Sequence, residues 1–461
     1  MKNLVSWSRM KLTFHGGAKA VTGSNYLVKS KKATILVDCG LEQGGDAAGE
    51  TNFSDFPYDP KNIDAVFVTH AHIDHIGMIP KLVRKGFKGT IVSTHPTKDL
   101  AEPLLLDAEH LLRDEAERKK KTPPYEKKHI EAALSMWRSV EYHERHSVGD
   151  LSVEFFDAGH VLGSSFLAVR DEEGKTIVFS GDLGSVDSPF IRETEPICDA
   201  DYVLIESTYG GSVHKGIDTR KYILEDIIED TAKRKGTLLI PAFSLERTQE
   251  MLFELNELIE KGKVCRMPVF VDSPLATKIT EIYRSYAGDE RYFNKKSISL
   301  GKSGDDIFNF PGLQFTASER ESVKIEKAPN PKIVIAGSGM SQGGRVIMHE
   351  KRYLSDERNT ILFIGFQASG SLGRVIADGA ETVTIFGDDV PVKASVKVID
   401  GYSAHADQKK LLEWLAPARF SAKKVFIVQG DEDQAIKLSE KIRDELALST
   451  QIPSRGDSVV L

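Results

Sequence analysis

A short apolar stretch, DAVFV at residues 64–68, runs directly into THAHIDHIG, which holds three histidines and an aspartate within six positions. The apolar run predicts a buried strand, and His70 and His72 would leave its end with both imidazoles directed at one point. Asp74 and His75 follow at a spacing that reaches a second point nearby. Imidazole and carboxylate are ligands of zinc, iron and manganese, and core packing does not bring four such side chains together. We therefore expect a metal centre at the end of this strand.

Three later segments repeat this context of an apolar strand, a glycine turn and then a histidine or aspartate. They place His160 in DAGHVLGS, Asp182 in VFSGDLGS and His405 in IDGYSAHAD. A single histidine in a turn is weak evidence for a metal site. The shared context favours the interpretation that all three lie at the same sheet edge, where they complete the ligands of two metal sites.

The pattern of strands and helices changes twice along the chain. Short strands and turns dominate the first 208 residues, apart from a charged, helix-favouring segment at 98–147 that is broken at Pro123–Pro124. We interpret that segment as a solvated helical insertion; the alternative is a flap that touches substrate through Arg118–Lys121. From residue 209 strands alternate with helices, which predicts βαβ units around a parallel sheet. The chain is therefore expected to be of the α/β class.

Charge, cysteines and hydropathy limit the classes of function. A net charge of −7 over 461 residues argues against a protein that coats nucleic acid by bulk electrostatics, but a local basic groove stays compatible with it. The three cysteines are widely spaced and odd in number, which favours a reducing compartment. No apolar run has the length of a membrane span, and the opening MKNLVSWSRMKLTF lacks a signal-peptide core. We expect a cytoplasmic protein with no membrane partner.

The metal-site motifs resemble those of the metallo-β-lactamase superfamily. Asp38 in ILVDCG matches the first motif of that superfamily, HAHIDH its HxHxDH motif, and the three later residues its remaining metal motifs. The long segment between Asp182 and His405 contains IESTYG, PAFSLERTQE, VDSPLA, GSGMSQGGR and GFQASGSLGR. These are similar to motifs of the β-CASP nucleases, among them the 73-kDa endonuclease subunit of the cleavage and polyadenylation specificity factor and its bacterial and archaeal homologues without KH domains.

The resemblance covers nearly the whole chain and implies an αββα metallo-β-lactamase sandwich with an inserted β-CASP α/β domain. Residues 1–208 would form the first part of the sandwich, with the helical insertion at 98–147. Residues 209–374 would form the β-CASP domain, and 375–461 would complete the sandwich.

The same resemblance implies two Zn²⁺ ions, with Mn²⁺ or Fe²⁺ fitting nearly as well. The implied ligands are His70, His72 and His160 for one ion, Asp74, His75 and His405 for the other, and Asp182 between the two. Asp38 would lie behind the cluster and orient ligands or water. Glu206, in IESTYG, matches the acidic β-CASP motif and would orient a catalytic histidine or the attacking hydroxide.

The implied activity is hydrolysis of RNA phosphodiester bonds by a hydroxide that the two zinc ions activate. Cutting would be internal, with additional 5′-exonucleolytic cutting left open, and the partner would be single-stranded RNA. His405 favours RNA over DNA by analogy within the subfamily, and a homodimer is left open. The alternatives are a dizinc hydrolase of DNA or of a small molecule, and a non-catalytic RNA-binding relative.

Two residues depart from the family pattern. A histidine that is a favoured general acid follows a GTLA-like turn in the eukaryotic relatives, and Val375 stands there in this chain. Valine cannot donate a proton, so a water, a neighbouring histidine or a metal-bound group would have to serve. Relatives also often carry a histidine before Gly-Glu near the C-terminus, where this chain has Gln429, which we interpret as a tolerated change.

Phosphate recognition needs hydrogen-bond donors, and the glycine-rich stretch 337–345 follows a predicted strand and opens a helix. Such a turn can cradle an anion, which makes Ser338 and Arg345 candidates for substrate binding; the alternative is a tight turn alone. Arg247 and Arg374 are further candidates, against surface or structural ion pairs. The same stretch contains GMSQG, which matches the G-x-S-x-G motif of serine hydrolases, with Asp400 and His405 downstream. That alternative leaves the histidines at 70–75 unexplained.

Overall fold

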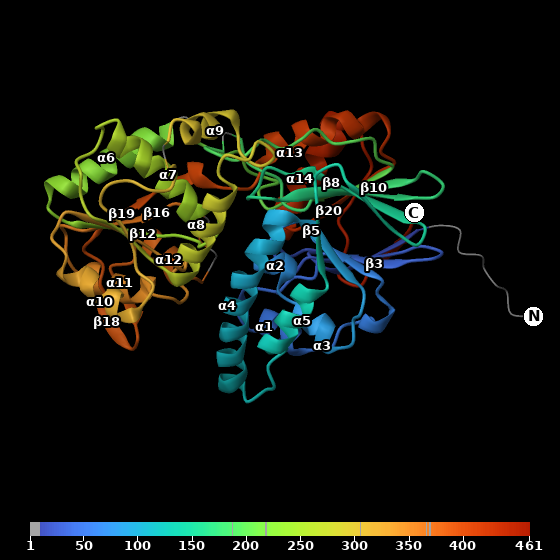
Figure 1. The fold of residues 1–461 in the computed structure, drawn as a ribbon, viewed down its shortest axis with the longest axis horizontal. Coiled ribbons are helices and arrows are strands. Elements are labelled where there is room, and N and C mark those ends of the chain that lie inside the picture. The colour runs from blue at the N-terminus through green and yellow to red at the C-terminus, as the bar shows by residue number, and fades with distance from the viewer. Residues whose placement is uncertain (1–9, 187, 217–218, 305, 366, 368–369) are drawn as a thin grey trace, which may run out of the picture. The chain divides into compact units, whose positions relative to one another are not determined.

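The computed structural model describes residues 10–186, 188–216, 219–304, 306–365, 367 and 370–461 (Figure 1). The chain forms two compact units. The first unit comprises Met1–Val186, Glu193–Val213 and His405–Leu461, and the second comprises Asp187–Arg192 and His214–Ala404. In the structure the chain returns to the first unit at residue 405, because β19 (Ser395–Val398) pairs with β16 (Thr360–Phe363) inside the sheet of the second unit.

Two seven-stranded sheets make up the described strands of the first unit. The first sheet has the order β22 (Ser458–Val460), β1 (Lys11–Gly16), β2 (Asn25–Lys29), β3 (Thr34–Val37), β4 (Ala65–Phe67), β5 (Thr90–Thr94), β6 (Trp137–Val140). The second has the order β21 (Thr450–Gln451), β20 (Lys424–Val428), β11 (Tyr202–Glu206), β10 (Thr176–Phe179), β9 (Ser165–Asp171), β8 (Leu151–Asp157), β7 (Arg145–Val148). Strands β3 to β6 run parallel to one another, as do β10, β11 and β20.

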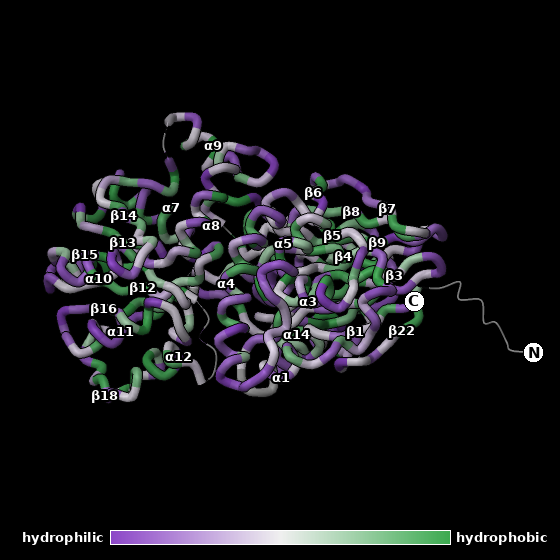
Figure 2. The backbone as a smooth tube through the Cα atoms, turned by 60° about the horizontal axis from the view of Figure 1, so that its bottom comes forward, coloured by the Kyte–Doolittle hydropathy of each residue, from purple (hydrophilic) through white to green (hydrophobic). Residues whose placement is uncertain are grey.

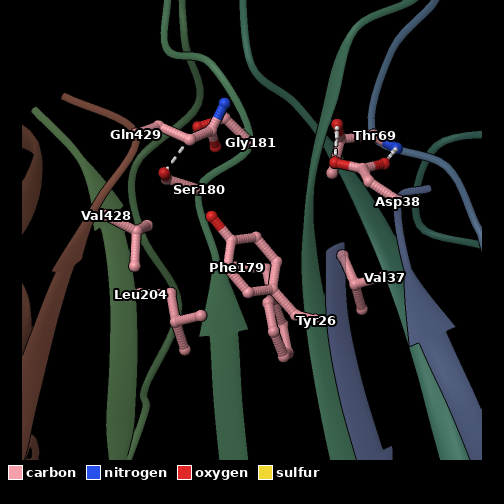
Figure 3. A pocket seen from close by; sticks show the side chains of 10 residues that line it. All are labelled: Tyr26, Val37, Asp38, Thr69, Phe179, Ser180, Gly181, Leu204, Val428 and Gln429. Carbon is pink, nitrogen blue, oxygen red and sulfur yellow. Dashed lines mark hydrogen bonds between the residues drawn. The ribbon is translucent and has the colours of Figure 1, made fainter. Parts of the chain in front are cut away.

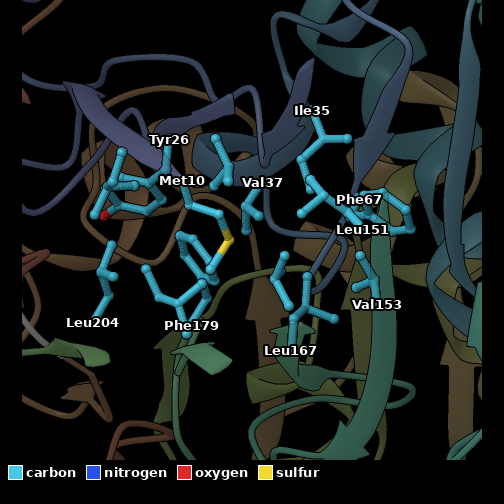
Figure 4. Close-up of a cluster of buried hydrophobic side chains, with 14 of the residues drawn as sticks. Met10, Tyr26, Ile35, Val37, Phe67, Leu151, Val153, Leu167, Phe179 and Leu204 are labelled. Carbon is cyan, nitrogen blue, oxygen red and sulfur yellow. The ribbon is translucent and has the colours of Figure 1, made fainter. Parts of the chain in front are cut away.

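The inner faces of the two sheets share one apolar core. Alternate residues of the first sheet, such as Val37 and Phe67, lie in the same cluster as Leu167, Phe179 and others from the second (Figure 4). Burial of these faces is the main force that holds the sheets together. A one-residue slip of any strand would turn its apolar residues away from this core.

Helices cover the outer face of each sheet. Helices α2 (Ile73–Ile76), α3 (Ile79–Arg84), α4 (His95–Lys119) and α5 (Lys127–Ser135) contribute to the apolar cluster on the first sheet. Helices α13 (Gln408–Leu415) and α14 (Glu432–Leu446) do the same on the second, and α1 (Gly45–Phe53) follows β3 in the chain. This four-layer order confirms the predicted αββα sandwich.

The segment 98–147 differs from the expected, almost strand-free insertion. Its helices α4 and α5 are present, and the inner side of α4 buries Leu105, Leu112 and Ala116. The remainder, however, contains β6 and β7, which end the two sheets. The apolar ends of the segment WRSV, Trp137 and Val140, are buried in β6, so this part of the segment belongs to the sheets of the sandwich.

The second unit is built around a parallel sheet. Its order is β14 (Leu313–Phe315), β13 (Val269–Asp272), β15 (Lys332–Ala336), β12 (Thr237–Pro241), β16, β19. The intervening helices are α6 (Arg220–Lys233), α7 (Arg247–Glu260), α8 (Pro274–Tyr286), α9 (Lys295–Lys302), α10 (Glu319–Lys327), α11 (Val346–Tyr353) and α12 (Leu372–Ala377). A separate hairpin joins β17 (Thr382–Ile385) and β18 (Asp388–Pro391). This alternation confirms the predicted inserted α/β domain.

Hydrophobic residues concentrate in strands such as β4 and β5, while hydrophilic residues occupy much of the helices and loops around them (Figure 2). Among the described residues, we find no helix that combines the length and the apolar character required to cross a bilayer.

Candidate metal centre

The candidate site of the first unit lies where strands of both sheets end. Asp182 follows β10, Glu206 ends β11, and Gln429 follows β20, and these three strands are parallel neighbours. Asp38 follows β3 and His70 follows β4, which are parallel neighbours in the other sheet. Carboxyl ends of parallel strands share one sheet edge, so polar residues far apart in the sequence meet there.

One set of donor atoms comes from His70, His72, His160 and Asp182, and all four lie within 4.8 Å of one another. Nδ1 of His72 is 3.0 Å from Nε2 of His70 and 3.2 Å from Nε2 of His160. Nε2 of His70 is 3.4 Å from Oδ2 of Asp182. Tetrahedral ligands at zinc-bond lengths of about 2.0–2.1 Å are separated by about 3.3–3.4 Å. Three imidazoles and a carboxylate at these separations fit a zinc ion.

The protonation of this set suits a ligand role. Burial lowers the pKa of His72 well below its ordinary value, and the neighbouring His70 lowers it further. Burial likewise lowers the pKa of His160, and His405 adds to the effect. Metal binding requires the neutral imidazole, which is the form that these surroundings favour.

A second set of donors lies on the other side of Asp182. Nε2 of His75 is 3.4 Å from Oδ1 of Asp182 and 3.8 Å from Oδ2 of Asp74. The opposite nitrogen of His75, Nδ1, lies 2.7 Å from Oδ2 of Asp38. The backbone N–H and the hydroxyl of Thr69 both donate to the Asp38 carboxylate at 2.8 Å. Asp38 thus lies behind the cluster and orients His75 toward it.

Gln429, which the sequence alone suggests is a tolerated change, is part of this second set. Its amide nitrogen is 2.9 Å from Nε2 of His75 and 2.9 Å from Oδ1 of Asp182. The residue is 2% exposed, and its backbone N–H donates to the carbonyl of Gly17 at 2.7 Å. Figure 3 shows Gln429 and Asp38 at the ends of strands from the two sheets, above apolar core residues.

His405 is paired with Glu206. Its Nδ1 lies 3.1 Å from Oε2 of Glu206 and 3.8 Å from Oδ2 of Asp182. The His405 side chain is 25% exposed, whereas Glu206 is fully buried. Asp182, Glu206 and His405 also form a close set of three donors. These distances place His405 beside Glu206 and Asp182, and its predicted role as a ligand together with Asp74 and His75 stays a prediction.

Two of the arginines predicted to bind substrate are buried or half-buried and bond protein groups. Arg345 donates to Oδ1 of Asp272 at 2.7 Å and to the carbonyls of Thr316 and Ala317 at 3.1 Å each. Burial would raise the pKa of Asp272, but hydrogen bonds from His349 and other donors hold it well below its ordinary value. Arg247 is buried, and its guanidinium donates to Glu250 and to the carbonyl of Tyr402. These contacts favour the structural ion pair that the sequence left open for Arg247, and they give Arg345 a structural partner as well.

The glycine-rich stretch 337–345 folds as a turn in which backbone N–H groups are hydrogen-bonded to acceptors of the same loop. The N–H groups of Ser338, Ser341 and Val346 donate to carbonyls within the loop, and that of Gln342 donates to the Ser338 hydroxyl. Four N–H groups that an anion cradle would use are therefore already bonded, and Ser338 closes the turn.

Ser341 of GMSQG is not arranged as a nucleophile. It is 1% exposed, and its hydroxyl donates to Glu350. The side chain of Asp400, its predicted acidic partner, lies outside the part of the structure that is described. Val375 is 43% exposed on α12. Arg374, on the same helix, is exposed and bonds Asp378 at 2.8 Å, and its predicted role in substrate binding stays a prediction.

Comparison with known proteins gives successive family matches along the chain. The model of the metallo-β-lactamase superfamily matches residues 18–197, that of the β-CASP domain 248–376, and that of the Zn-dependent metallo-hydrolase RNA specificity domain 389–453. A ribonuclease of Thermus thermophilus is 38% identical over 94% of this chain and 95% of its own length.

Other relatives carry different names. An RNase J-like protein of Methanocaldococcus jannaschii is 30% identical over 96% of this chain and 98% of its own length. A transcription termination factor, FttA, of Methanosarcina mazei is 30% identical over 98% of this chain and 72% of its own length. A crystal structure of a protein of unknown function from Enterococcus faecalis shares the fold, with a TM-score of 0.57 at 15% identity and coverage of 98% of this chain and all of that one.

Proposed function

The chain belongs to the metallo-β-lactamase superfamily and carries its β-CASP insertion, and we propose that it is a ribonuclease that hydrolyses single-stranded RNA with bound divalent metal ions. The observation that carries the proposal is the convergence of two donor sets on Asp182. The curated relatives named as ribonucleases, together with the match to an RNA specificity domain, support RNA as the substrate.

The side chains have separate tasks in this proposal. His70, His72 and His160 would hold the first ion, Asp74 and His75 would contribute to the second, and Asp182 lies within reach of both sets. Bound there, the ions would lower the pKa of a water toward neutrality and stabilise negative charge on the phosphate. Three imidazoles and a carboxylate make zinc the proposed ion of the first site.

His405 is the proposed proton donor to the leaving ribose oxygen, a role for which Val375 has no suitable group. Glu206 bonds Nδ1 of His405 and so orients the ring, and we propose that Nε2 donates the proton. Burial would lower the pKa of His405, but the charges of Glu206 and Asp182 outweigh it and raise the pKa to about 9. A protonated imidazole that is held by a buried carboxylate is suited to general acid catalysis. Direct attack by water on phosphorus, with the P–O3′ bond breaking and the 3′-oxygen taking the proton, leaves a 5′-phosphate on one product and a 3′-hydroxyl on the other.

A single strand is the proposed form of the substrate because the cluster is recessed. His70, His75 and His160 are at most 1% exposed, and Asp182 is 4% exposed. A single strand can bring one phosphate to such a site with less deformation than a duplex. Both internal and 5′-terminal cutting are compatible with these residues. We propose no base preference, since phosphate contacts carry no sequence information.

Two competing proposals fare less well. A non-catalytic relative would not need both donor sets and the Glu206–His405 pair, and a serine hydrolase would need a free Ser341 hydroxyl.

We also propose a cytoplasmic location, which is supported by three cysteines that are all free thiols. Whether the chain forms a homodimer stays a prediction of its own, which light scattering coupled to gel filtration checks.

The experiment compares a 5′-labelled single-stranded RNA with the DNA of the same sequence, with and without a strong chelator. Cleavage of RNA alone, lost on chelation and restored by Zn²⁺ or Mn²⁺, with 5′-phosphates on the products, is the expected result. Cleavage that survives complete metal removal would contradict the proposal. Cutting of both strands at equal rates would move the assignment to a nuclease without sugar selectivity.

A further inference from the structure

The second donor set contains Gln429, at a position where relatives often carry a histidine. The first set offers three imidazoles and a carboxylate, whereas the second offers one imidazole, two carboxylates and the amide of Gln429. We propose that Gln429 is a ligand of the second metal site. Its amide makes that site weaker, and less selective for zinc over manganese, than the first. The inference rests on the proposed metal-dependent function.

The position of Gln429 is built into the fold. The residue follows β20 directly and has a φ of 45°, a left-handed conformation that costs free energy in a residue other than glycine. Backbone hydrogen bonds on both sides hold it there: its N–H donates to Gly17, and its carbonyl accepts the N–H of Ser207 at 3.0 Å. These bonds come from both sheets, so the backbone that carries the amide is fixed on two sides.

The side chain is held in contact with the other candidate ligands. Its amide group lies 2.9 Å from both Nε2 of His75 and Oδ1 of Asp182, the two atoms that face the second site. The oxygen and nitrogen of a glutamine amide have nearly the same shape. A half-turn about the terminal bond therefore places the carbonyl oxygen where the nitrogen now lies, and an amide oxygen, unlike its nitrogen, is a metal ligand.

The chemistry of the ligands determines which metal ion each site prefers. Imidazole suits zinc, whereas carboxylate and carbonyl oxygens suit magnesium and manganese. An uncharged amide oxygen also donates less electron density to zinc than an imidazole nitrogen. The expected protein keeps one zinc ion firmly at His70, His72, His160 and Asp182. The second ion exchanges with solvent and is replaced readily by manganese.

The test is metal binding, measured without reference to cleavage. Zinc-loaded protein is dialysed against a weak chelator, and the remaining zinc per chain is measured by mass spectrometry. A second equivalent of Zn²⁺ or Mn²⁺ is then titrated by calorimetry. The variants are Gln429→His and Gln429→Ala, and the control is Gln314→His, which adds a histidine at an exposed position of β14.

We expect the wild type and the control to retain one zinc per chain and Gln429→His to retain two. Gln429→His should tighten the second zinc at least about tenfold, the lower end of what even an outer partner of a ligand contributes, and should tighten manganese much less. Gln429→Ala should weaken both ions. Gln429→Glu, which keeps the size of the side chain and supplies a charged oxygen, should tighten both, and it serves if the histidine variant does not fold.

Two equal zinc sites in the wild type would overturn the inference, as would tighter metal binding by Gln429→Ala, because the amide would then be an obstacle and not a ligand. RNA cleavage that depends on metal, together with two equal sites, would overturn the role of Gln429 and leave the proposed function intact. Absence of metal from both sites, with no cleavage, would overturn both.

Discussion

Nδ1 of His75 lies 2.7 Å from Oδ2 of Asp38, and the opposite ring nitrogen of His75 faces Asp182 at 3.4 Å. A carboxylate behind a ligating histidine fixes its orientation and raises its basicity. We therefore expect Asp38→Asn to weaken metal binding by about 10–100-fold while the αββα fold remains. Calorimetric titration of the metal-free protein measures the change. Asp226→Asn, at an exposed position of α6, is the control, and equal affinity of the two variants would contradict the orienting role.

The Glu206–His405 pair predicts a shift in the pH dependence of cleavage. A proton donor is active only below its pKa, so the rate should fall as pH rises through the pKa of His405. Glu206 raises that pKa, and Glu206→Gln should therefore move the alkaline fall in kcat to lower pH. His405→Ala should lower kcat by about 10²–10⁴-fold. An alkaline limb that stays in place in Glu206→Gln would show that His405 is not the titrating group.

The buried contacts of Arg247 predict a loss of stability. Arg247→Ala would leave the buried carboxylate of Glu250 without its adjacent cation, a change that costs about 3–5 kcal/mol. Thermal unfolding followed by circular dichroism should show a lower Tm for this variant. An unchanged Tm combined with weaker RNA binding would instead restore the substrate-binding role that the sequence suggested.

Arg374 should behave in the opposite way. It is exposed and paired with Asp378, so its replacement by alanine should leave the Tm unchanged. If its guanidinium contacts a phosphate, Arg374→Ala should reduce the salt dependence of RNA binding by about one unit of slope. Arg358→Ala is a matched control, because Arg358 is also exposed and paired with an aspartate, Asp356. The same slope in both variants would remove Arg374 from the RNA-binding surface.

Glu350 predicts a pH-dependent stability in the second unit. Burial raises its pKa from 4.5 to about 7, against the hydrogen bond from Ser341. The folded state therefore binds the proton more tightly, and this stabilisation is complete below about pH 4.5 and disappears as pH rises through about 7. Glu350→Gln should remove up to about 3 kcal/mol of that pH dependence. Tm values measured at pH 5 and pH 8 test this, and equal slopes for the variant and the wild type would contradict it.

Much of the fold and of the metal centre follows from local sequence. The αββα sandwich, the inserted α/β domain and the family were predicted from motifs and are confirmed. His70 and His72 were predicted because they leave an apolar strand within a cluster of histidines and an aspartate. His160 and Asp182 were predicted because each follows an apolar strand and a glycine turn. The structure brings the four together. That signal works because parallel strands place their carboxyl ends at one edge.

The remaining features depend on which segments become neighbours. Gln429 follows β20 in the same context as Asp182 follows β10, but an amide alone does not suggest a ligand. The relation of His405 to Glu206 arises from two segments nearly two hundred residues apart. Residues 375–404 stay with the second unit because β19 joins its sheet, and Arg345 finds its partner Asp272 on β13. Periodicity within one segment carries no information about such long-range pairing.

Asp182 is the residue on which both donor sets depend, so its removal tests the account most directly. Wild type and Asp182→Ala are compared for metal content and for the rate of cleavage of one labelled RNA under single-turnover conditions. We expect the variant to keep its fold, to hold less metal and to cut at least about a thousandfold more slowly, the rate equivalent of several kcal/mol of lost charge stabilisation. Cleavage at the wild-type rate by a folded Asp182→Ala protein that has lost its metal would contradict the metal-dependent mechanism.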